Sequence, residues 1–384
     1  MSHATRPADT YSPLYFLASL GAGGLSVTFF MYLMFWVPHP DQPVPVFEDI
    51  MAAFNSGNVA LQAAIAVAYV GIAVFAFLNI KMLVWNLRSF SAFSKTEAWQ
   101  KLKNSNGETQ VLAMPLALAM TVNALFVVGL VFVPGLWSIV EYLFPFAMVA
   151  FALIAWLAFR FIGDFLGRVL SQGGVFDVTA NNSFAQLLPA FALSMTAVGM
   201  AAPAAMSTNP LTVGVSLVLS IMLGTVAALY AVVAAIVAFN SMLHHGTAKE
   251  SAPTLMVVVP ILTILGIMTM RQTHGLHTTF EVHGAAVENL LLTTTILAVQ
   301  FVFAALGMLV LNRQKYGETF LRGEKTSPGS YALVCPGVAL SVMTHFWINK
   351  GLVANGLIAK FGLAYWRFTA VAIFDTVCFD FQIG

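Results

Sequence analysis

Charged residues are scarce in this chain. Only 9% of its 384 residues are Asp, Glu, Lys or Arg, whereas 59% are hydrophobic; an average soluble domain carries roughly 25% charged residues. So few charges cannot supply the polar surface of a soluble enzyme, and the hydrophobicity is too high for a disordered chain. The net charge of +1 lacks the basic excess of a nucleic-acid-binding protein. The sequence therefore predicts a chain whose main solvent is the lipid bilayer, with no nucleic acid as a partner.

Cysteine is rarer still. Two residues, Cys335 and Cys378, exclude a disulfide framework, and no CxxC or Cys/His zinc spacing occurs. Each lies near the expected inner end of one of the last two apolar segments. Two interpretations remain open: small buried apolar residues, or a pair of sulfurs close enough for redox chemistry.

Long apolar segments dominate what is present. A helix needs about 20 apolar residues to cross the hydrocarbon layer, and ten such segments occur. Their expected limits are Pro13–Val37, Val59–Trp85, Val111–Val133, Leu136–Phe161, Phe184–Met206, Leu211–Met242, Pro253–Met270, Ala285–Leu311, Ser330–Trp347 and Leu357–Phe379. The sequence predicts an all-α integral membrane protein: a cytoplasmic N-terminal tail at 1–12 and one ten-helix transmembrane domain at 13–384.

The distribution of basic residues indicates the orientation. With the N-terminus in the cytoplasm, thirteen of the seventeen Lys and Arg residues fall on the inner side, as the positive-inside rule requires. The four exceptions are Arg271, Lys350, Lys360 and Arg367, on the outer side or in the last returning helix. We therefore expect both termini in the cytoplasm.

An internal repeat covers the odd-numbered helices. Helices 3, 5, 7 and 9 carry Pro115, Pro189, Pro260 and Pro336, separated by 74, 71 and 76 residues. Proline removes a backbone donor and clashes with the carbonyl four residues earlier, and lipid cannot satisfy the orphaned carbonyl. We expect proline-bent odd helices in an inner ring around a central pore, and even helices in an outer ring. The repeating unit is one helical hairpin, which gives five hairpins.

A Met-Thr dipeptide follows each of these prolines, and the chain has no other. The threonines are Thr121, Thr196, Thr269 and Thr344. Two interpretations remain: ordinary helix packing, or hydroxyl groups that line the pore.

Ten spans in five hairpins with proline-bent odd helices resemble the TehA-like superfamily of tellurite-resistance/dicarboxylate transporters and plant slow anion channels. The segment Cys335-Pro336-Gly337 and the following His345-Phe346-Trp347 are most similar to its bacterial TsoY branch, some of whose members carry selenocysteine. The resemblance implies a bacterial inner membrane, a homotrimer of independent pores, and a phenylalanine that closes each pore near mid-membrane. The candidates for this gate are Phe191, Phe126 and Phe346.

Basic side chains gather where two odd helices end. Arg271, His274 and His277 follow helix 7 on the outer side, and His345 and Lys350 end helix 9 on that side. A ring of basic groups at a pore entrance attracts anions, although solvated loop residues beside lipid head groups would look the same. We expect these five residues to form an anion-attracting mouth.

Two functions compete at this level. The first is a channel or transporter that passes a small anion through a central pore gated by an aromatic constriction, with no enzymatic step and no cofactor. The alternative is a redox-active membrane protein that handles sulfur or selenium compounds, or a bound metal or haem. It would use Cys335 and Cys378 together with His274 and His277, since imidazole is a common metal ligand.

Overall fold

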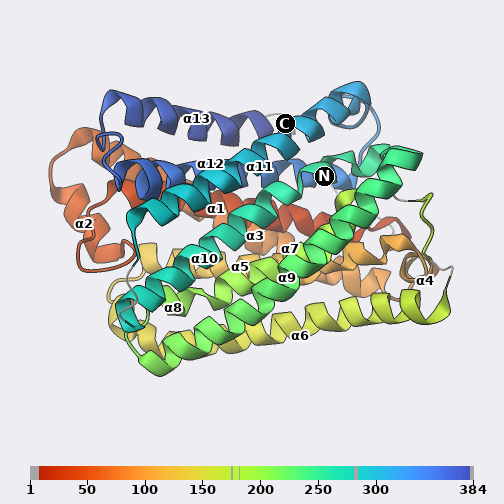
Figure 1. The fold of residues 1–384 in the computed structure, drawn as a ribbon, viewed down its shortest axis with the longest axis horizontal. Helices are drawn as coiled ribbons and strands as arrows, with labels where there is room; N and C mark the ends of the chain where they lie inside the picture. Colours follow the sequence, from red (N-terminus) through yellow and green to blue (C-terminus); the bar gives the residue numbers. More distant parts are fainter. Residues whose placement is uncertain (1–7, 174–175, 181, 281–283, 381–384) are drawn as a thin grey trace, which may run out of the picture.

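The computed structural model describes residues 8–173, 176–180, 182–280 and 284–380, with 375–380 as helix backbone. Within these residues every regular element is a helix. The long helices lie side by side, roughly along the longest axis of the molecule (Figure 1). They are α1 (Phe16–Trp36), α3 (Val59–Phe93), α5 (Ala113–Phe132), α6 (Val140–Gln172), α7 (Leu188–Met200), α9 (Pro210–His245), α10 (Val258–Phe280), α11 (Ala286–Arg313), α12 (Val334–Phe346) and α13 (Leu363–Asp380).

The prediction of an all-helical membrane protein is confirmed. In the described part of the chain, nine helical segments are long and apolar enough to cross a bilayer. The tenth predicted span corresponds to α13, whose described apolar stretch, Leu363–Phe374, is shorter; that span stays a prediction. Short helices lie at opposite ends of the bundle, α2 (Phe47–Asn55) at one and α4 (Glu97–Lys103) at the other (Figure 1).

Burial alternates from one span to the next. In the most apolar window of the first, third, fifth, seventh and ninth spans, 67 to 94% of the residues are buried; in the second, fourth, sixth and eighth, 22 to 33% are. The exposed side chains of the even spans are mainly large apolar residues, as expected for a surface in contact with lipid rather than water. The odd spans therefore form the interior of the bundle.

Contacts between helices agree with this division. The buried helices follow one another in a closed order, α1 against α5, α5 against α7, α7 against α10, α10 against α12, and α12 back against α1. Exposed helices pack on this set from outside, α3 on α1, α9 on α7 and α11 on α10, while α13 packs on α12. A site enclosed by the five buried helices thus receives side chains from segments more than 300 residues apart.

The four repeated prolines lie in the first turn of an α-helix. Pro189 is the second residue of α7, and Pro115, Pro260 and Pro336 are the third residues of α5, α10 and α12. A short 3₁₀ helix precedes each one. We expected bends inside α-helices. The prolines instead mark the change from 3₁₀ to α geometry, where the missing amide would have had no intrahelical partner.

Serine residues open these 3₁₀ segments. The side chains of Ser12, Ser105, Ser183 and Ser327 each accept a hydrogen bond from the backbone amide two residues later. Serine is a preferred N-cap because its hydroxyl satisfies an amide that the helix leaves free. The first span lacks the repeated proline but has this serine. Among the five odd-numbered spans, only the seventh does not begin with a serine N-cap in the described residues.

Candidate functional site

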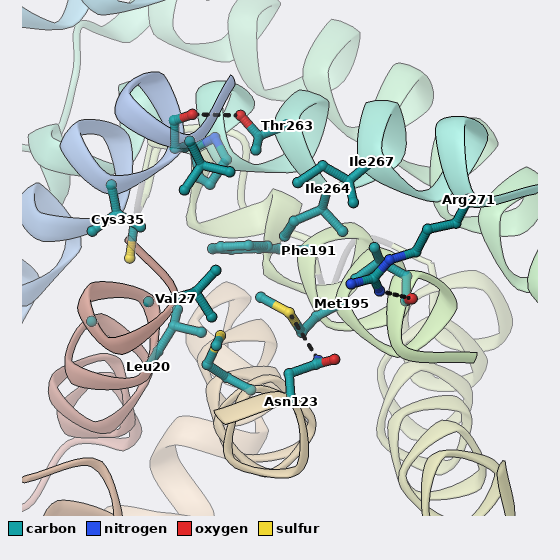
Figure 2. A pocket seen from close by; sticks show the side chains of 18 residues that line it. Leu20, Val27, Asn123, Phe191, Met195, Thr263, Ile264, Ile267, Arg271 and Cys335 are labelled. Carbon is teal, nitrogen blue, oxygen red and sulfur yellow. Dashed lines mark hydrogen bonds between the residues drawn. The ribbon is translucent and has the colours of Figure 1, made fainter. Parts of the chain in front are cut away.

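A cavity of about 130 Å³ lies at the centre of the bundle. All five buried helices, α1, α5, α7, α10 and α12, contribute to its wall (Figure 2). Most of the wall is apolar and includes Leu20, Val27, Met195 and Ile264. Arg271 is the one charged side chain among the described residues that line it. The cavity is therefore a mostly apolar chamber with a single fixed positive charge.

Arg271 lies where three cavities meet. Besides the central cavity, it lines a larger chamber and a lateral pocket of about 100 Å³. Its Nη1 atom donates a hydrogen bond to the carbonyl of Val198, 2.7 Å away (Figure 2). Among the described residues no carboxylate lies within ion-pair distance of it. The guanidinium group therefore keeps donors available to the cavities.

The sequence predicted a span that ends at Met270, with Arg271 in the loop that follows. The structure corrects this prediction. Helix α10 continues to Phe280, because its polar residues find partners inside the protein. Gln272 donates to Ser220 Oγ at 2.9 Å, and Thr273 donates to the carbonyl of Thr269 at 2.9 Å. At Gly275 the helix passes so close to the carbonyl of Ala204 that a β-carbon would collide with it. Arg271 therefore lies within the bundle and not in a solvated loop.

The larger chamber, which we call the vestibule, has a volume of about 440 Å³. Arg271, His274, His277 and Lys350 line it together, as the sequence had suggested, and His39 from the loop after α1 joins them. No Asp or Glu occurs among its described lining residues. His39 was missed because a lone histidine in a connecting loop carries no pattern. The described lining of the vestibule thus combines apolar and neutral polar residues with five basic ones and no acidic one.

Lys360, in the loop before α13, adds to this positive field. Burial, followed by the charge of Lys350, lowers the pKa of its ammonium group below the ordinary value. Lys350 and Lys360 are therefore close enough to interact electrostatically, and no described carboxylate forms an ion pair with either of them.

His345 does not belong to the vestibule, in contrast to the prediction. It is fully buried, its Nδ1 atom lies 2.8 Å from the carbonyl of Ser341, and its ring packs against Tyr32 and Phe35 of α1. Lys350 lies beyond the end of α12, in the π-helical segment Trp347–Val353, where its side chain is exposed and lines the vestibule. The two side chains therefore point in different directions, and His345 serves helix packing.

The three gate candidates occupy different places. Phe191, 2% exposed, lines the central cavity and also a small pocket of about 10 Å³ near the N-terminal ends of the buried spans. Phe126 stacks on Phe144 beside the lateral pocket, and Phe346 packs edge-on against Phe35 at the vestibule. Of the three, only Phe191 lines two of the described cavities, and its ring lies at the centre of the wall shown in Figure 2.

The threonines of the Met-Thr pairs do not line any described cavity. Thr121, Thr196 and Thr269 each donate to the carbonyl four residues earlier in their own helix, and Thr344 is buried. In the first two pairs it is the methionine that faces the central cavity, and the next residue of a helix points about 100° away. The prediction of pore-lining hydroxyl groups at these positions is therefore not supported by the geometry.

Thr263 is the threonine that reaches the cavity. Its hydroxyl donates to the carbonyl of Ala339 at 2.9 Å and lies 2.6 Å from the amide nitrogen of Gln300. Its hydrogen-bonding capacity is thus used between helices. Its position could not be read from the repeat, because Thr263 lies between the repeated proline and the repeated Met-Thr pair and belongs to neither.

Of the two cysteines, Cys335 lines the central cavity near Phe191 (Figure 2). The side chain of Cys378 lies outside the described residues, so the proposed redox pair has no measured separation. Across the part of the chain that the structure describes, no three His, Cys, Asp or Glu side chains gather as a metal site would require. No described contact favours the redox alternative.

The fold and the cavities define a class: a multi-pass, all-α membrane protein with a mostly apolar cavity between its buried helices. No protein-family model matches the chain, and a search of curated proteins finds no match. The roles of its residues therefore rest on the geometry.

Proposed function

We propose that this protein is a channel or uniporter for a small anion. In this proposal the five buried spans form an inner ring around the path, and the even spans with α13 surround them, giving ten helices in five hairpins. The anion enters the vestibule, meets Arg271, passes through the central cavity and leaves past Phe191.

The observation that carries the proposal is the position of Arg271. A cationic side chain within a membrane bundle is expensive unless an opposite charge or a polar partner compensates it. Here one hydrogen bond to the Val198 carbonyl is present, and no described carboxylate pairs with it. A passing anion completes the site and is stabilised by the remaining guanidinium donors.

The vestibule supports entry of an anion from the outer side. Lys350 and Lys360, with the nearby histidines, create a positive field in a chamber without described acidic lining residues. Such a field raises the local concentration of anions and slows the entry of cations. Lys350 thus attracts the anion, while Arg271 binds it.

Phe191 supplies the constriction in this proposal. Phe191 lines both the central cavity and the small pocket near the N-terminal ends of the buried spans, and an apolar ring in a narrow path opposes the passage of hydrated ions. Passage then requires the ring to move aside, which a change in its side-chain rotamer can provide.

The wider assignment follows the same resemblance as before. We propose membership of the TehA-like superfamily, a homotrimer of independent pores, and a bacterial inner membrane with both termini in the cytoplasm. Transport requires no covalent step and no bound cofactor in this mechanism.

The test is anion flux through proteoliposomes that contain the purified full-length protein. The vesicles should dissipate a nitrate or chloride gradient faster than empty vesicles. The Arg271→Gln variant should be slowed, whereas Arg313→Gln, which removes an exposed arginine at the end of α11, should transport like the unmodified protein. Gradients that persist as long as in empty vesicles, for every anion tried, would refute the proposal.

A further inference from the structure

The central cavity has one polar end and a long apolar wall. Arg271 lies at the end that opens to the vestibule, and the rest of the described lining is largely side chains of Leu, Val, Ile, Met and Phe. The side-chain amide of Asn123 donates to the carbonyl of Ala119 at 3.0 Å and lies 3.8 Å from the sulfur of Met195. The hydroxyl of Thr263 is likewise engaged. Arg271 therefore provides the free donors of this chamber.

We infer that the central cavity selects a small monoanion with a short apolar tail, of the type of a short-chain carboxylate. This inference rests on the proposed function, since it names the substrate class of the same path. The carboxylate binds the guanidinium group of Arg271, and the hydrocarbon tail lies among the apolar side chains toward Phe191.

The volume of the cavity limits the length of the tail. An apolar cavity of about 150 Å³ in another protein accepts benzene, a molecule of six carbon atoms. At about 130 Å³, the chamber here accommodates an anion of similar or slightly smaller size. Propionate and butyrate, which have no more non-hydrogen atoms than benzene, fit, and the longer hexanoate does not.

The charge pattern disfavours two other kinds of anion. A dicarboxylate would place its second charge near Phe191 and Cys335, where no described lining residue is cationic, and an unpaired buried charge is strongly unfavourable. Chloride or nitrate would bind Arg271 but leave the apolar surface uncovered. A single guanidinium group and an apolar chamber together match a monoanion with an apolar tail.

The first test is binding, measured by isothermal titration calorimetry with the detergent-solubilised full-length protein at pH 7.5. Each methylene that leaves water should strengthen binding about fourfold, equivalent to about 0.8 kcal/mol. Affinity should therefore rise from acetate through propionate to butyrate and fall for hexanoate. Succinate and nitrate should bind more weakly than butyrate. The Arg271→Gln variant, titrated in the same detergent, measures any uptake of the acids by the micelle.

A pair of variants tests whether the size of the central cavity determines the preferred chain length of the acid. Ile264 lines the cavity, whereas Ile261, one turn earlier on the same helix, is buried but does not line it. Ile264→Ala should move the preferred acid from butyrate to a longer chain. Ile261→Ala carries a similar packing loss and should leave the preference at butyrate.

The outcomes separate this inference from the proposed function. The inference is overturned if affinity is independent of chain length or is highest for succinate. If the protein still conducts nitrate in that case, the proposed function stands. Chain-length selectivity that is the same in Ile264→Ala and Ile261→Ala also overturns the inference. Rising affinity to butyrate, lost in Arg271→Gln and shifted in Ile264→Ala, supports it, even where flux measurements count against transport.

Discussion

Arg271 and Lys350 carry the same charge but should respond differently to salt. Both line the vestibule, yet only Arg271 also reaches the central cavity, and Lys350 is exposed. Replacing each by glutamine removes one positive charge from the same path. The pair therefore separates binding of the anion from its electrostatic attraction.

The expected magnitudes follow from these positions. A hydrogen bond to a charged group contributes roughly 1.5–3 kcal/mol, so Arg271→Gln should weaken the apparent affinity for the anion by about 10- to 150-fold. An exposed charge contributes about 1 kcal/mol or less, so Lys350→Gln should cost about fivefold at most. The Debye length falls from about 10 Å at 0.1 M salt to about 3 Å at 1 M. The effect of Lys350 should disappear over this range, while that of Arg271 should remain.

The assay is initial anion flux into proteoliposomes as a function of anion concentration, at total ionic strengths of about 0.1 and 1 M set with an impermeant salt. Each variant is compared with the unmodified protein at the same ionic strength, and protein incorporation is measured for every preparation. Thermal unfolding of the detergent-solubilised variants serves as the control for folding.

The reasoning about Arg271 fails if its variant recovers normal affinity at high salt, because a charge that contacts the anion in an enclosed site is not screened by bulk ions. It also fails if the two variants lose affinity equally at both ionic strengths. In that case the guanidinium group would belong to a solvated mouth, as the sequence alone had suggested.

Three further predictions concern other parts of the bundle. Phe191→Ala should raise anion flux by about tenfold or more, which corresponds to a barrier lower by about 1.4 kcal/mol. Phe126→Ala, a matched loss of one ring, should not raise it. Equal flux in the two variants would show that Phe191 is not the constriction. Glu108→Gln should lower stability by about 3–5 kcal/mol, because Glu108 and Arg168 form a 2.7 Å ion pair with side chains only 6% and 13% exposed; an unchanged unfolding temperature contradicts this. Thr196→Val should leave flux within about twofold, since its hydroxyl bonds to its own helix, and a large loss would return Thr196 to the path.

Much of the fold could be predicted from the sequence. The scarcity of charge and the long apolar segments predicted an all-helical membrane protein, because lipid leaves few other ways to satisfy the backbone. The proline series marked four of the five spans that the structure buries, although the prolines lie in the first turns of their α-helices and not at bends within them. The limits of the spans were less accurate, and α3, α6 and α10 all run further than predicted.

The site was predicted only in part. The cluster of Arg271, His274, His277 and Lys350 could be seen as basic residues where basic residues are rare, and the structure brings them around one vestibule. His345 was misplaced because its direction depends on its angle around α12, which sequence spacing did not reveal. The threonines were misplaced for the same reason, since the neighbouring methionines take the cavity face in two of the pairs.

The sequence by itself determined that this chain belongs in a bilayer and which of its helices are interior, because both follow from local composition and from the demands of lipid on the backbone. Only the tertiary structure decided that Arg271 lies inside the bundle, that Phe191 lines two cavities, and that the central cavity is mostly apolar. These features depend on how five helices, distant in the chain, rotate against one another. A few basic residues were enough to suggest a site, but the packing around Arg271 decides which anion the central cavity can bind.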